Sequence, residues 1–117
     1  MSTTNHFMLL FRFRPTIEYE PSKEELTEQH QKWGEFIGNI AIQEKLVHTH
    51  QLGFEGMTIA TDLEETEGIH ISENQTLGGN MVVKANSLEE AVTLAKNCPI
   101  LQMNGSVEVR SIVPMES

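Results

Sequence analysis

The sequence predicts an α+β fold in which one antiparallel sheet carries two helices on the same face. Three observations support this prediction. Segments that alternate between apolar and polar residues, as strands do, occur near both ends and in the middle of the chain. Two capping-box patterns mark the starts of two helices. Both halves of the chain follow the order strand, helix, strand, which is typical of paired βαβ units.

The first strand is predicted over residues 7–14, which read FMLLFRFR. The odd-numbered residues of this segment are all apolar and fall on one face: Phe7, Leu9, Phe11 and Phe13. The other face begins apolar with Met8 and Leu10 and ends basic with Arg12 and Arg14. Because both faces begin apolar, we expect a central strand rather than an edge strand.

The first helix is predicted to begin after Ser22, which forms a capping box with Glu25, and to run to about Glu44. One stripe of this helix recurs at steps of three and four and is expected to be buried: Leu26, His30, Trp33, Ile37, Ile40 and Ala41. Gly34 and Gly38 lie inside the helix, where each costs up to about 1 kcal/mol relative to alanine. We therefore expect another element to approach closely on that side.

Residues 46–52 alternate again and predict a second strand, with Leu46, His48, His50 and Leu52 on one face. Residues 53–68 contain three glycines and an acidic cluster, so they predict turns around a short strand at 57–60. Another short strand is predicted at 69–72. A longer one is predicted over residues 80–85, after Gly78 and Gly79.

The second helix is predicted to follow Ser87, which pairs with Glu90 in another capping box, and to end at Pro99. Residues 106–113 alternate as a last strand, and Pro114 ends it. Two right-handed βαβ units laid side by side give an antiparallel sheet with both helices on one face, the ferredoxin-like arrangement. The length of 117 residues fits one domain spanning 1–117.

Two helices cover only one face of such a sheet, yet its strands carry apolar residues on both faces. On the last strand, Val107 and Val109 oppose Ile112. The uncovered face needs a partner because apolar surface of that extent is unfavourable in water. We expect a two-fold homodimer that packs sheet against sheet.

Charge and composition exclude several classes of protein. The formal net charge is −9, with 17 acidic residues against 8 lysines and arginines that form no cluster, so we expect no nucleic-acid partner and no anionic membrane partner. The acidity is most simply explained by solubility. No run of 18 apolar residues occurs, and Cys98 is the single cysteine, so a reducing, cytoplasmic location is predicted.

His30 is the best candidate for chemistry, because a ring on the apolar stripe of a helix is suited to proton transfer near neutral pH. The alternative is a core histidine bonded to a backbone carbonyl or packed on Trp33. Glu67 and Asp62, in the acidic loop, are candidate acidic partners of His30. The alternative for that loop is a solvated turn.

His48 and His50, with His30 nearby, are candidate ligands for a transition-metal site. A His-x-His pattern is also explained by two polar positions on a half-exposed strand, so no metal ligand and no cofactor is predicted. Arg12, Arg14 and Arg110 lie on strands that such a sheet brings close together, and a guanidinium there can hold a carboxylate. Ion pairs of these arginines with Glu18 or Glu108 are the alternative.

Three functions remain open on these residues. The first is a binding module with a small organic ligand in a pocket between the sheet and the first helix, lined by His30, Trp33, His48 and Met81, with Arg12 and His50 as further ligand-binding candidates. The second is an acid/base enzyme that uses His30 on a small carbonyl or carboxylate substrate, assisted by an arginine or Glu67. The third is a structural or interaction dimer without catalysis.

Several segments, in this order and spacing, resemble the YCII-related (DGPF-motif) family. They are Met8-Leu9-Leu10-Phe11, His30 before Trp33-Gly34, Lys45-Leu46-Val47, Leu77-Gly78-Gly79, Ser87-Leu88-Glu89-Glu90-Ala91, Cys98-Pro99-Ile100-Leu101 and Gly105-Ser106-Val107-Glu108-Val109-Arg110. The resemblance spans nearly the whole chain and implies a dimeric α+β barrel. It also implies an acid/base pair in which His30 is the histidine, whereas the acidic position falls on Ile42. The signature Asp-Gly-Pro-Phe falls on Glu67-Gly68-Ile69-His70.

Overall fold

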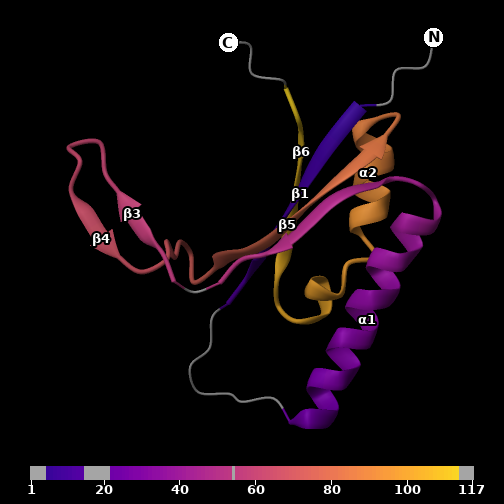
Figure 1. Cartoon of the computed structure of the whole chain (residues 1–117), viewed down its shortest axis with the longest axis horizontal. Coiled ribbons are helices and arrows are strands. Elements are labelled where there is room, and N and C mark those ends of the chain that lie inside the picture. Colours follow the sequence, from indigo (N-terminus) through magenta and orange to yellow (C-terminus); the bar gives the residue numbers. More distant parts are fainter. Residues whose placement is uncertain (1–4, 15–21, 54, 114–117) are drawn as a thin grey trace.

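The chain folds into a four-stranded antiparallel sheet with two helices on one face and a separate two-stranded hairpin (Figure 1). The computed structural model describes residues 5–14, 22–53 and 55–113. Its elements are β1 (Asn5–Phe13), α1 (Lys23–Ile42), β2 (Leu46–Gln51), β3 (Met57–Ile59), β4 (Glu65–Glu67), β5 (Thr76–Ala85), α2 (Leu88–Ala95), the 3₁₀ helix η1 (Pro99–Gln102) and β6 (Ser106–Ser111). The sheet has the order β2-β5-β1-β6. This order, with all neighbours antiparallel, confirms the predicted ferredoxin-like fold.

The core lies between the sheet and the helices. Phe7, Leu9 and Phe11 of β1 are buried on this side, as the alternation of the strand predicts. On β5, Met81 pairs with Leu9 and Val83 pairs with Phe7, so their side chains point the same way. The helices add their own apolar residues to this cluster: Phe36, Ile40, Ala91, Leu94 and Ala95.

Both predicted helix starts are confirmed by their caps. The Ser22 hydroxyl accepts a hydrogen bond from the Glu25 backbone N–H at 3.2 Å, and the Ser87 hydroxyl accepts one from the Glu90 backbone N–H, also at 3.2 Å. Each bond satisfies a donor that the first turn of a helix leaves without an intrahelical partner. The cap therefore fixes where each helix begins.

The buried stripe of α1 differs from the prediction. Phe36 and Ile40 are buried and Trp33 is half-buried, whereas Leu26 and His30 are exposed. The first turns of α1 extend beyond the sheet, as the lower part of Figure 1 shows, so apolar spacing there does not produce burial. The expectation that His30 lies on a buried stripe is therefore wrong.

The two glycines of α1 face open space. A Cβ atom added at Gly34 or at Gly38 would meet nothing within 4 Å, so the close approach that was expected on this side of the helix is absent from the described protomer. We predict that Gly34→Ala and Gly38→Ala each raise the free energy of unfolding by up to about 1 kcal/mol, because alanine restricts the unfolded chain more. Urea denaturation followed by circular dichroism measures the change.

Gly105→Ala is the control for this prediction. A Cβ atom at Gly105 would lie 2.6 Å from the Arg12 carbonyl oxygen and 2.9 Å from that of Ile100, so this variant is expected to lose stability. If Gly34→Ala or Gly38→Ala were as damaging as Gly105→Ala, the open side of α1 would have to be covered in solution.

The segment between β2 and β5 forms an arm, which we define as residues 57–67. It consists of β3, β4 and the turn between them, with Met57 paired to Glu67 and Ile59 to Glu65. The predicted strand at 57–60 is confirmed. The one at 69–72 is wrong, since Ser72 makes only an isolated bridge to Gln75. The strand that pairs with β3 instead is β4, whose Glu-Thr-Glu sequence has no apolar alternation by which to recognise it.

The arm gives the chain an extended shape. In Figure 1 it leaves the sheet on the side opposite α1 and α2. The radius of gyration is 16.1 Å, compared with about 13 Å for a compact domain of this length. None of the described helices is long and apolar enough to cross a membrane.

Candidate functional site

The sheet has one face without helices, which we call the open face. Its residues follow from the strand pairing, because directly paired residues of antiparallel strands point to the same side. Met8 pairs with Val82 and Arg110, and Leu10 pairs with Asn80 and Glu108. The open face therefore comprises His48 and His50 of β2, Leu77, Asn80, Val82 and Lys84 of β5, His6, Met8, Leu10 and Arg12 of β1, and Ser106, Glu108 and Arg110 of β6.

The centre of the open face is apolar. Met8, Leu10 and Val82 are half-buried by their neighbours in the sheet, and no described element lies over them. Polar groups border this strip on both sides, with the histidines along β2 and a cluster of charged side chains along β6. The face thus combines an apolar floor with donors at its edges, which is the usual composition of a ligand site or an interface.

A β-bulge places His48 and His50 on the open face. Leu46 pairs with Val83 on the helix side, but His48 pairs with Val82, so Val47 is an extra residue in β2. The prediction that Leu46 shares a face with the two histidines is therefore wrong, because one extra residue reverses the alternation. The two imidazole rings are stacked, with centroids 6.2 Å apart.

The three-histidine arrangement is not formed within the described protomer. His30 lies on α1, behind the sheet, and His48 and His50 lie in front of it. In the described ranges, no three His, Cys, Asp or Glu side chains gather in a way that could hold a metal ion. The geometry here offers two neighbouring imidazoles that can donate or accept hydrogen bonds.

The charged border of the open face is an ion-pair cluster. Arg12 Nη1 lies 2.7 Å from Glu108 Oε1, and Arg110 Nη1 lies 3.8 Å from Glu108 Oε2. The predicted pairing with Glu108 is confirmed, whereas Glu18 lies outside the described residues. All three side chains are partly exposed, so water screens these pairs and their contribution to stability is small.

The described residues leave no room for the predicted pocket between the sheet and the first helix, around Met81 and Trp33. Met81 is 0% exposed. The Trp33 ring packs edge-on against Phe11 and Phe36, with ring centroids 5.3 and 5.9 Å apart. Aromatic rings therefore fill the space that was expected to hold a ligand, and Trp33 and Met81 belong to the core rather than to a common site with His48.

His30 and Glu67 do not meet within one protomer. His30 is exposed on α1, and Glu67 is exposed on β4; Figure 1 shows these elements on opposite sides of the sheet. Asp62 instead accepts a hydrogen bond from the Glu64 backbone N–H at 3.0 Å, which is the local turn that was the alternative for this loop. The acid/base role of His30 stays a prediction, without an acidic partner among the described residues.

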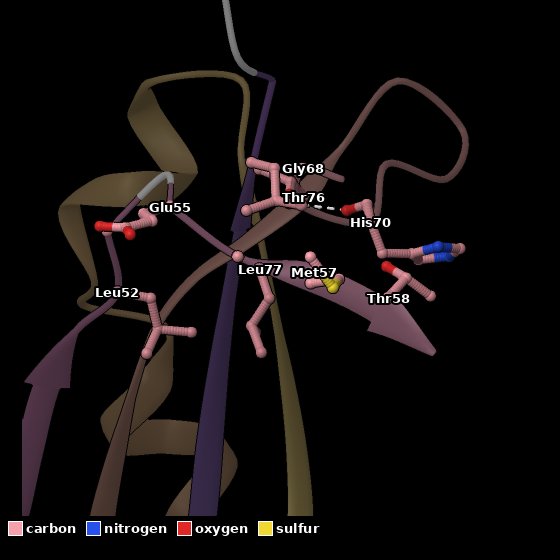
Figure 2. A pocket seen from close by; sticks show the side chains of 11 residues that line it. Leu52, Glu55, Met57, Thr58, Gly68, His70, Thr76 and Leu77 are labelled. Atoms are coloured by element: carbon pink, nitrogen blue, oxygen red, sulfur yellow. Dashed lines mark hydrogen bonds between the residues drawn. The ribbon is translucent and has the colours of Figure 1, made fainter. Parts of the chain in front are cut away.

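A hollow of about 340 Å³ lies at the base of the arm (Figure 2). It is lined by Leu52, Gly53, Glu55, Gly56, Met57, Thr58, Gly68, Ile69, His70, Thr76 and Leu77. Thr76 is buried there and donates a hydrogen bond to the His70 carbonyl oxygen at 2.7 Å. Leu77 belongs to the open face, so the hollow continues that face. No motif predicts the hollow, because its lining comes from three separate segments.

Among the described residues, the two titratable groups with shifted pKa values, Cys98 and Glu90, lie away from the open face. Burial raises the pKa of the Cys98 thiol to about 11, so Cys98 is a buried, unreactive thiol. A hydrogen bond from Lys45, whose Nζ lies 2.9 Å from Glu90 Oε1, lowers the pKa of the Glu90 carboxyl. Neither group contacts the candidate site.

Comparison with known protein families matches residues 6–116 to the YCII-related domain. The matched segment includes both α-helices and all the described strands, apart from Asn5, the first residue of β1. Among the curated proteins compared, none matches the chain.

Proposed function

The chain belongs to the YCII-related domain family, and we propose that it acts as a homodimer that binds a small organic ligand between two open faces. The observation that carries the proposal is the composition of the open face. Met8, Leu10 and Val82 form an uncovered apolar strip, and three of the predicted ligand residues, Arg12 and the two histidines, border it. A dimeric α+β barrel would enclose this strip.

A second copy of the chain is the simplest cover for the open face. A two-fold axis in the plane between two sheets brings the two apolar strips together, so that the strip of each protomer is buried by that of the other. Burial stabilises such a contact by about 25 cal/mol per Å² of apolar surface. The acidic partner of His30, in contrast, has no support in the described protomer, so the acid/base enzyme is the less favoured function.

The border groups favour a small organic carboxylate as the ligand. Arg12 uses Nη1 for Glu108, and a guanidinium carries further donors that can bind a second carboxylate. His48 and His50 add hydrogen-bonding groups on the opposite side of the apolar strip. The anionic group of such a ligand would therefore contact the border residues, and its apolar part would contact the apolar strip.

A cytoplasmic location remains the prediction from the single cysteine.

Benzoate is the probe that tests this proposal. We expect benzoate to shift the amide NMR signals of open-face residues in β1, β2 and β5 in a saturable way, whereas the uncharged benzamide binds at least about tenfold more weakly because it lacks the carboxylate. Arg12→Gln is expected to abolish the difference between the two probes. Lys96→Gln, which removes a positive charge on the helix side, is the control and is expected to keep it.

The ligand proposal fails if benzoate leaves the open-face signals unchanged in a protein that is dimeric. The interaction dimer without a ligand would then be the function that the open face supports. Shifts confined to other surfaces would also contradict a site between the sheets.

A further inference from the structure

The arm carries apolar side chains that its own protomer leaves exposed. Met57 is 52% exposed, Ile59 is 64% exposed, and Leu63, in the turn, is 79% exposed. Met57 and Ile59 pair with Glu67 and Glu65, so they share one face of the hairpin, and the Thr58–Thr66 pair occupies the other. The arm therefore has one face that carries Met57 and Ile59 beside Glu65 and Glu67, and an opposite face, the threonine face, that carries Thr58 and Thr66.

Hydrogen bonds order the turn of the arm. The Ala60 backbone N–H donates to the Glu64 carbonyl at 2.9 Å, and the Leu63 N–H donates to the Ala60 carbonyl at 2.8 Å. The Asp62 carboxylate accepts from the Glu64 N–H at 3.0 Å. Leu63 adopts a φ of 71°, in the left-handed region that disfavours residues with a Cβ atom. These hydrogen bonds hold Leu63 at the tip of the arm with its side chain exposed.

The arm also lies on the side where a second copy would be. Figure 1 shows it extending from the sheet on the side of the open face, away from both helices. An isolated two-stranded hairpin is marginally stable in water. The described residues of the same protomer leave the apolar side chains of the arm exposed, and a second copy at the proposed interface would cover them.

The area of the open face supports the same conclusion. Four strands about 4.8 Å apart, with about six residues of about 3.3 Å each, give a flat footprint of about 400 Å². Stable interfaces bury about 800 Å² on each partner. Side-chain relief enlarges the footprint, but the face alone still stays near the lower limit, and two arms would add to it.

We propose that the arm of each protomer packs Met57 and Ile59, together with Leu63 of the turn, against the second protomer and so clasps the dimer. This inference rests on the proposed dimer. Because the dimer is two-fold, every arm contact occurs twice, and each substitution in the arm contributes twice to the free energy of dissociation.

The test compares two faces of the same hairpin. We expect the double variant Ile59→Ser, Leu63→Ser to raise the dimer dissociation constant in analytical ultracentrifugation at least about tenfold, since it removes apolar surface at both arms. The control Thr58→Ala, on the threonine face, is expected to change the constant less than about twofold. Circular dichroism of each variant confirms that the sheet and helices persist.

Hydrogen exchange of the arm amides separates this inference from the dimer itself. We expect slow exchange at the Thr58 and Thr66 amides, which the register pairs across the hairpin, in the wild-type dimer, and fast exchange in the Leu10→Glu variant, in which the open face cannot pair. A wild-type protein that is monomeric overturns the proposed dimer. A wild-type dimer with fast-exchanging arm amides, or with an unchanged dissociation constant in the double variant, overturns the clasp alone. Slow exchange in monomeric Leu10→Glu also overturns it, because the arm would then pack on its own protomer.

Discussion

Replacing Leu9 by alanine is expected to lower the free energy of unfolding by about 3 to 5 kcal/mol, the range for a leucine deleted from a well-packed core. Leu9 lies in the central strand β1, is 0% exposed and is paired with Met81 on one side and Val109 on the other. Its neighbours are held by the sheet and cannot collapse into the space. Urea denaturation at a fixed protein concentration measures the loss.

Leu101→Ala is the control for this prediction. Leu101 is partly exposed on η1, so the same chemical deletion is expected to cost less than about 1 kcal/mol. Equal losses in the two variants would mean that the core between the sheet and the helices is packed differently from the arrangement described above.

Replacing Leu10 by glutamate is expected to dissociate the proposed dimer while leaving the protomer folded. Leu10 is the neighbour of Leu9 in sequence but belongs to the open face, between Asn80 and Glu108. A carboxylate there would be buried against the second sheet and would lie beside Glu108. Desolvation and like-charge repulsion together are expected to raise the dissociation constant by about a hundredfold or more.

Sedimentation and circular dichroism together check this expectation. The variant should sediment as a monomer and keep the far-ultraviolet spectrum of the wild type, because a solvent-facing position tolerates a charge. Leu101→Glu, with the same substitution on the helix side, should remain dimeric. A Leu10→Glu protein that stays dimeric would place the interface elsewhere.

The sequence carries the fold in its local signals. The alternation of residues 7–13 gives the buried face of β1 correctly, and the two serine caps give the helix starts. These features are predictable because each depends on residues within a few positions of one another. The element order then leaves few possible topologies, and the ferredoxin-like one is found.

The candidate site depends on features without such local signals. The bulge at Val47 moves His48 and His50 from the helix side to the open face, and nothing in the sequence of β2 marks it. Burial along α1 depends on where the sheet ends, so His30 satisfies the helical period and yet is exposed. Trp33 packs against the core as its stripe predicts, but its contact with Phe36, a residue outside that stripe, fills the space expected for a ligand. Each error arises where tertiary position, rather than periodicity, decides the environment.

The proposed ligand site and the proposed clasp both require that two protomers meet through their open faces. Sedimentation equilibrium of the wild-type protein at low micromolar concentration measures this most directly. We predict a single species with twice the mass of the 13.2 kDa chain. A species of 13.2 kDa at every concentration up to the millimolar range would contradict the account.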